Sequence, residues 1–138
     1  MFEKNLLNYF RRQGVSSSQD DDLVQETYLR LWNYRDRYVP TAKLSTFLFT
    51  LARQVRIDAL RAESRRLTRE KDWAEARPDI IDSSSVSVDA REDVRWALAQ
   101  LSPEHREVIE FGVFQDLPYA EIAEILEIPL GTVKSRMF

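Results

Sequence analysis

Apolar residues recur every three or four positions along most of the chain, which is the period of an amphipathic α-helix. In the first half this period predicts three helices, over residues 1–13, 22–34 and 45–66. Gly14 is the expected stop of the first, an aspartate within 20–22 the cap of the second, and Ser45 or Thr46 the start of the third. The side chains placed inward are Phe2, Leu6, Leu7, Phe10, Leu23, Val24, Thr27, Tyr28, Leu31, Trp32, Phe47, Leu48, Leu51, Ala52, Val55, Ala59 and Leu60.

Residues 67–90 interrupt this pattern. They contain Pro78, a serine run at 83–85 and an acidic excess, which is the composition of a linker. A helix resumes near Arg91, and Ser102 followed by Pro103 begins another, because serine caps a helix and proline suits its first position. The pattern therefore predicts an all-α fold with two small helical domains, 1–66 and 91–138, joined by the linker 67–90.

The last twenty residues, 119–138, have the pattern of a helix-turn-helix. Pro118 suits the first turn of one helix, and Pro129 marks the break before the next. In this motif the second helix normally enters the DNA major groove, although an ordinary helical hairpin has the same pattern. The expected shared core is Ile122, Ala123, Leu126, Ile128 and Val133, and the expected DNA contacts are Thr132, Lys134, Ser135 and Arg136.

The net charge of −3 hides a segregation of charge along the chain. Basic residues outnumber acidic ones over 53–71, whereas acidic residues dominate 72–93. On the helix predicted over 45–66, Gln54, Asp58, Arg61 and Arg65 recur at helical spacing and form a polar, net basic stripe. This stripe is either a surface for a polyanion or a solvated face with an Asp58–Arg61 pair.

The composition excludes several classes of protein. The chain has no cysteine, so neither a disulfide framework nor a thiolate metal site is available, and a cytoplasmic location fits. No segment has the length and hydropathy of a membrane span, so we expect no membrane insertion. Neither a phosphate-binding glycine loop, nor a catalytic triad, nor a metal-ligand cluster stands out. We therefore expect no enzymatic activity, no metal and no cofactor. A chain of this length can bury one modest core or two small ones.

Three blocks of sequence together carry a resemblance that covers nearly the whole chain. They are DLVQETYLRLW at 22–32, FLFTLARQVRIDALR at 47–61, and the terminal motif, with YAEIA at 119–123 and GTVKSR at 131–136. The chain resembles the bacterial extracytoplasmic-function (ECF) RNA polymerase sigma factors of the sigma-70 superfamily. The resemblance implies a subunit that directs core RNA polymerase to specific promoters and initiates transcription. It also implies promoter DNA and an anti-sigma factor as further partners.

The resemblance also implies roles for particular residues. The first domain would dock on polymerase and would read and open the minus-ten element, and the second would read the minus-thirty-five element. The positions matching the polymerase-docking segment are Gln25, Glu26, Leu29 and Arg30. The positions matching the minus-ten segment are Tyr38, Lys43, Ser45, Thr46, Gln54, Arg56, Asp58, Arg61 and Arg65. Gln54 stands where asparagine is common in the family and Phe47 where tryptophan is usual, which changes the expected base preference.

The family pattern continues several turns past Arg136, whereas this sequence ends at Phe138. The recognition helix predicted here is therefore about two turns long, a length that needs packing to be stable. This apparent truncation leaves two alternatives to a sigma factor. One is a sigma-like interaction module that binds polymerase or a regulator without full promoter recognition. The other is an autonomous helix-turn-helix DNA-binding regulator.

Overall fold

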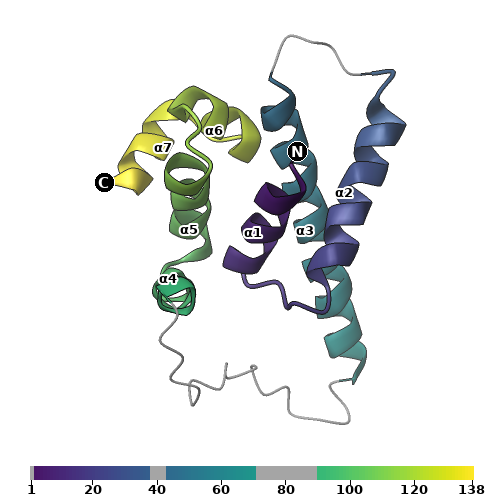
Figure 1. Ribbon diagram of the computed structural model, residues 1–138. Helices are drawn as coiled ribbons and strands as arrows, with labels where there is room; N and C mark the ends of the chain where they lie inside the picture. The colour runs from purple at the N-terminus through teal and green to yellow at the C-terminus, as the bar shows by residue number, and fades with distance from the viewer. Residues whose placement is uncertain (1, 38–42, 71–89) are drawn as a thin grey trace.

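The computed structural model describes residues 2–37, 43–70 and 90–138 (Figure 1). Within these ranges the chain forms helices and no strand, which confirms the predicted all-α class. The elements are α1 (Glu3–Arg12), α2 (Asp20–Tyr34), α3 (Leu44–Glu70), α4 (Ala90–Ala99), α5 (Pro103–Ile109), the π-helical turn η1 (Glu110–Phe114), α6 (Tyr119–Leu126) and α7 (Leu130–Met137). None of the described helices is long and apolar enough to span a bilayer.

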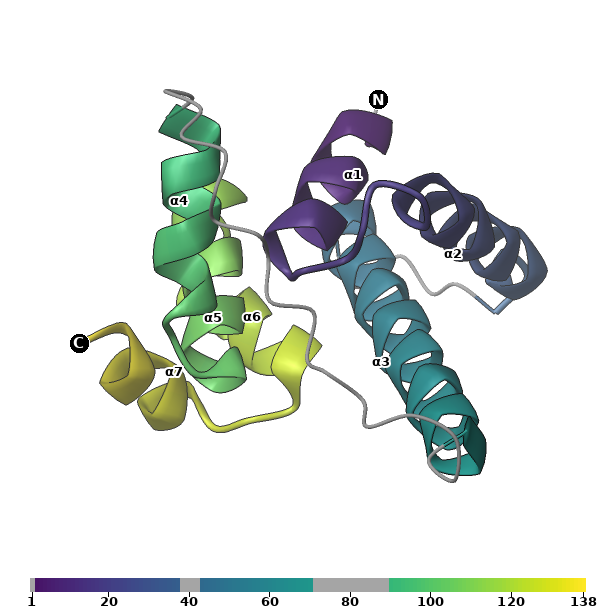
Figure 2. The same cartoon turned by 90° about the horizontal axis from the view of Figure 1, so that it is seen from below.

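The helices form two groups with α1 between them. Helix α2 packs along α3, and α1 contacts both of these helices. On the other side α5, η1, α6 and α7 pack on one another, and α6 also contacts α3. Figures 1 and 2 show α1 flanked by the α2–α3 pair and by the group that contains α4 to α7. The second half of the chain therefore lies directly against the first.

The helix ends follow the local signals at most positions. Gly14 adopts φ +90°, a left-handed conformation that glycine tolerates, and this confirms the predicted stop after α1. Ser102 caps α5 by accepting a bond from the backbone N–H of His105, with Pro103 at the start of the helix. Helix α3 runs to Glu70, past the expected end near residue 66, because residues 67–70 contain no glycine or proline to stop it.

The cap expected for the second helix was wrong. The N-cap of α2 is Gln19, and it makes no side-chain cap bond. Asp20 lies in the first turn instead, where its carboxylate is buried and accepts a hydrogen bond from Arg11 Nε at 2.6 Å. Its other carboxylate oxygen accepts from the backbone N–H of Asp21 at 2.7 Å, so this side chain serves both the first turn of α2 and the pair with α1.

The terminal helices form the predicted helix-turn-helix. Glu127, the C-cap of α6, adopts a left-handed φ of 55°, and Pro129 is the N-cap of α7. The backbone N–H of Ile128 donates to the carbonyl of Ala123 at 3.1 Å, which closes the turn. Ile122, Leu126 and Val133 are buried in the main hydrophobic cluster together with Ile125, and Ala123 and Ile128 pack against that cluster. The predicted shared core of the motif is therefore confirmed.

The buried apolar residues of the two groups belong to one cluster. Phe111 of η1 stacks on Tyr9 of α1 at 5.5 Å between ring centroids and meets Phe49 of α3 edge-on at 5.6 Å. All three rings are almost fully buried. Phe49 was not among the side chains predicted to lie inward. Helix α3 is packed on two sides, so its buried face is wider than a single amphipathic stripe.

Two side chains expected inside the fold lie outside it. Leu60 is 52 % exposed, because α3 extends beyond its packing partners and residues 60–69 are exposed. Trp32 is 63 % exposed near the end of α2, with the Arg35 guanidinium 4.0 Å from its ring centroid. Helical periodicity placed both residues on the apolar face, but the neighbouring helices do not cover these positions.

We predict that Phe111→Ala lowers the free energy of unfolding by about 3–5 kcal/mol, because it empties the contact between the two groups of helices. Val113→Ala, at a side chain of the same π-helical turn that is 59 % exposed, is expected to change it by less than about 0.5 kcal/mol. Urea unfolding followed by circular dichroism measures both variants. Similar losses of unfolding free energy in the two variants would show that Phe111 does not hold the two groups of helices together.

Candidate functional site

The outer face of α2 presents the residues expected to dock on polymerase. Gln25, Glu26 and Leu29 are exposed, and Arg30 is partly buried. Arg30 Nε donates to Glu26 at 3.1 Å, and its Nη1 pairs with Asp58 of α3 at 2.9 Å. Burial lowers the pKa of Arg30, but the bonds to Asp58 and Glu26 outweigh it and raise that pKa above its ordinary value. Arg30 therefore stays charged and joins α2 to α3.

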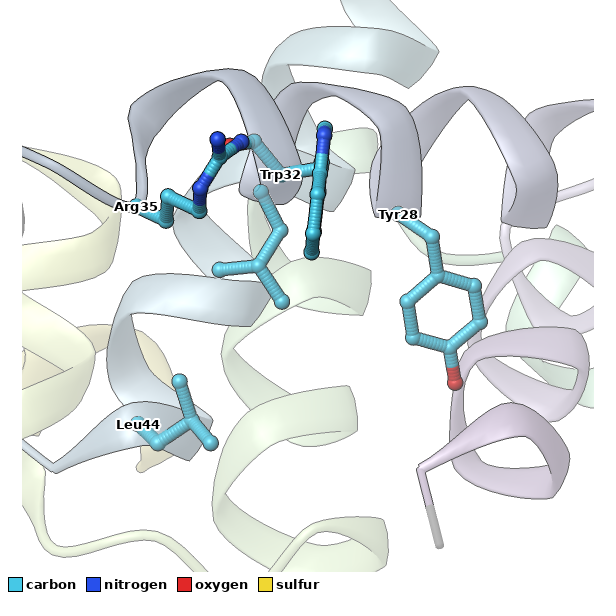
Figure 3. A pocket seen from close by; sticks show the side chains of 5 residues that line it. Tyr28, Trp32, Arg35 and Leu44 are labelled. Carbon is cyan, nitrogen blue, oxygen red and sulfur yellow. The ribbon is translucent and has the colours of Figure 1, made fainter.

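An open apolar hollow lies beside this face, between α2 and the start of α3 (Figure 3). It has a volume of about 450 Å³ and is lined by Tyr28, Leu31, Trp32, Arg35 and Leu44. Tyr28, Leu31, Trp32 and Arg35 were not predicted to belong to a functional site. The sequence carried no signal for them, because helical spacing assigned the apolar ones on α2 to the core.

The exposed stripe of α3 contains the predicted basic surface. Gln54, Asp58, Arg61 and Arg65 are all exposed, and the last three line a shallow hollow together with Ser64. Asp58 pairs with Arg30 of α2, whereas the sequence suggested Arg61 as its partner. No ion-pair partner of Arg61 or Arg65 occurs among the described residues. These two guanidinium groups are therefore available to an anionic ligand.

Arg56, also expected at DNA, lies on a different face of α3 and is only 8 % exposed. It pairs with Glu107 of α5, and its Nε donates to the Tyr9 hydroxyl at 3.2 Å. Burial raises the pKa of Tyr9 to about 12, so the hydroxyl is neutral. Burial also lowers the pKa of Arg56, but Tyr9 and Glu107 outweigh it and raise that pKa above its ordinary value. Arg56 is therefore a charged group covered by the second half of the chain.

Two of the residues matched to the minus-ten segment, Lys43 and Thr46 at the start of α3, contact the second half. Thr46 is buried, and its hydroxyl donates to Glu121 Oε2 of α6 at 3.1 Å. Lys43 is exposed but its Nζ lies 3.4 Å from the other oxygen of Glu121. Ser45 is partly buried, and Tyr38 lies outside the described residues. In this arrangement α6 therefore covers the beginning of α3.

Helix α7 carries the remaining predicted DNA contacts. Lys134 and Ser135 are exposed, and Thr132 and Arg136 are partly buried. The Ser135 hydroxyl donates to the Thr132 carbonyl at 3.0 Å, a bond within the helix. Val133, between them, is fully buried and fixes α7 against the rest of the motif. The helix thus presents Lys134 and Ser135 to solvent while its other side is packed.

Two models of sigma-70 domains match the chain, region 2 over residues 1–66 and region 4 over residues 91–138. The ECF RNA polymerase sigma factor RpoE of Cereibacter sphaeroides is 30 % identical, with 99 % of this chain and 76 % of that protein covered. The ECF sigma factor SigL of Mycobacterium tuberculosis is 37 % identical, with 96 % and 76 % covered. The chain belongs to the ECF RNA polymerase sigma factors. Proteins of this family direct core RNA polymerase to promoters and are not enzymes.

Two solved structures share the fold of this sigma factor. RpoE from Bartonella quintana, solved in complex with the anti-sigma factor NepR, has a TM-score of 0.80 at 25 % identity, covering 98 % of this chain and 84 % of that one. CnrH, solved in complex with the cytosolic domain of CnrY, shares the fold with a TM-score of 0.71 at 20 % identity, covering 99 % and 75 %. The sigma-factor interpretation therefore holds over the interaction module and the autonomous regulator.

Proposed function

We propose that this sigma factor docks on core RNA polymerase through the outer face of α2 and the adjoining apolar hollow. The observation that carries the proposal is the exposure of large apolar side chains there. Leu29 is 57 % exposed and Trp32 is 63 % exposed, next to the hollow that Tyr28 and Leu44 line. A contiguous apolar patch with a polar rim is typical of a protein-binding surface. Gln25 and Glu26 supply that rim on the same helix.

The proposal assigns promoter contacts to two helices. Residues 1–66 act at the minus-ten element through α3, and residues 91–138 act at the minus-thirty-five element through α7. Arg61 and Arg65 would hold phosphates, whereas Gln54 has the donor and acceptor needed to read a base edge. The pair between Asp58 and Arg30 supports this assignment, because it neutralises the acidic group of the stripe. Lys134 and Arg136 are the corresponding basic contacts on α7.

An anti-sigma factor is a further proposed partner. The RpoE neighbour is bound to an anti-sigma factor, and one superposition covers 98 % of this chain, including both halves. This likeness supports binding of a regulator to the packed arrangement described here. Association with bacterial polymerase also places the sigma factor in the cytoplasm.

Trp32→Ala is expected to abolish co-elution of this chain with purified core RNA polymerase, because it removes the largest exposed apolar side chain of the docking face. Trp96→Ala is the matched control, since Trp96 of α4 is 64 % exposed and lies outside that face. Size-exclusion chromatography of each variant with core enzyme makes the comparison. Retention of the complex by Trp32→Ala would refute the docking face, and no complex with the parent chain would refute the sigma-factor role.

Replacing Arg61 and Arg65 with Ala is expected to weaken promoter complexes of the holoenzyme and to flatten their salt dependence. Each lost phosphate contact lowers the slope of log affinity against log salt by about 1, because fewer counterions are released. The control is Arg95→Ala, at an exposed arginine of α4 outside the proposed DNA surface. Fluorescence anisotropy with labelled promoter DNA at several salt concentrations gives the slopes. Equal slopes for the double variant and the parent would exclude phosphate contacts on this stripe.

A further inference from the structure

Two arginines of α3 converge on one carboxylate of the second half. Arg53 Nε donates to Glu107 Oε2 at 3.1 Å, and Arg56 pairs with Glu107 Oε1. The hydroxyl of Tyr9 accepts from Arg56 Nε and fixes the orientation of that guanidinium. The Glu107 side chain is 11 % exposed and those of Arg53 and Arg56 are 26 % and 9 % exposed. The cluster is therefore an oxyanion site that is largely shielded from water and already filled by a group of the same chain.

The position of this cluster links it to the DNA surface. Arg53 and Arg56 belong to the same helix as Gln54 and Arg61, within one or two turns of them. Guanidinium groups recognise carboxylate and phosphate with the same geometry of donors. Glu107 therefore occupies guanidinium donors that a phosphate could also take.

We infer that Arg53 and Arg56 form an anion site that Glu107 occupies while the two halves are packed, and that a DNA phosphate occupies once they separate. This inference rests on the proposed function, because it adds a contact to the DNA surface of α3. Glu107 is an internal competitor in the free chain, and its release exposes two further arginines of α3, outside the stripe that carries Arg61 and Arg65. Binding to DNA and separation of the halves are thereby coupled.

A second carboxylate at the same interface provides a matched control. Glu110 accepts two bonds from Arg12 of α1, at 2.6 and 2.9 Å, and its side chain is 1 % exposed. It joins the two halves as Glu107 does, and replacing either glutamate with glutamine changes the net charge equally. Its partner Arg12 is on α1, so removing the Glu110 charge frees no arginine of the DNA-binding helix.

The experiment measures binding of the free 138-residue chain to a 20-base-pair DNA duplex by fluorescence anisotropy. Glu107→Gln is expected to bind about tenfold more tightly than Glu110→Gln, because charge-assisted bonds to Arg53 and Arg56 no longer compete with phosphate. Adding Arg53→Gln to Glu107→Gln is expected to remove most of that gain. Equal gains in Glu107→Gln and Glu110→Gln, or a gain that persists without Arg53, would overturn the inference.

Two further measurements keep these outcomes interpretable. Glu107→Asp retains the charge but shortens the reach to Arg53, so a smaller gain in the same direction is expected even if Glu107→Gln folds poorly. The absence of any gain in a folded Glu107→Asp would count against the site. Co-elution of each variant with core polymerase is measured separately, since it depends on α2. Intact co-elution without a gain in DNA binding refutes only this inference, whereas lost co-elution of the parent refutes the sigma-factor role.

Discussion

The arrangement of this sigma factor depends on one contact between its halves, the packing of Phe111 against Tyr9 and Phe49. Full burial of an aromatic side chain contributes about 1.5–3 kcal/mol, and three rings from three elements meet here. The carboxylates of Glu107 and Glu110, on the same side of this interface as Phe111, pair with arginines of the first half. Removal of one partner from a buried ion pair costs about 3–5 kcal/mol. These pairs therefore fix the orientation of the two halves relative to each other, which apolar packing alone does not set.

This packing divides the proposed functional surfaces into two classes. The outer face of α2 and the stripe with Arg61 and Arg65 remain uncovered, so the polymerase docking proposed on α2 would require no rearrangement. Thr46 and Arg56 are covered by α6 and α5, respectively. Promoter contacts at those two positions would therefore require the halves to separate. The proposed docking face and part of the proposed DNA surface are thus accessible in the packed arrangement, and the rest of that DNA surface is not.

The sequence predicted the helices well because their signals are local. Gly14, Ser102 with Pro103, and Pro129 act through their own backbone preferences, and each marks a helix end in the structure.

Burial against a distant helix was less predictable. Phe49 was missed and Leu60 was misplaced, because periodicity describes one helix face and says nothing of a second packing partner or of where packing ends. The pairing of Arg56 with Glu107, across 51 positions of sequence, likewise has no local signal. The roles proposed for the site residues rest on family resemblance and exposure.

The buried apolar residues of both halves form one core, which is expected to open as one cooperative unit in the free chain. Native-state hydrogen exchange measures this by comparing the opening free energies of core amides in α3, such as Ala52, with those in η1, such as Phe111. One common opening free energy with the same dependence on denaturant is expected for both sets. A second half whose amides exchange through a separate, less costly opening, while α3 remains protected, would contradict it.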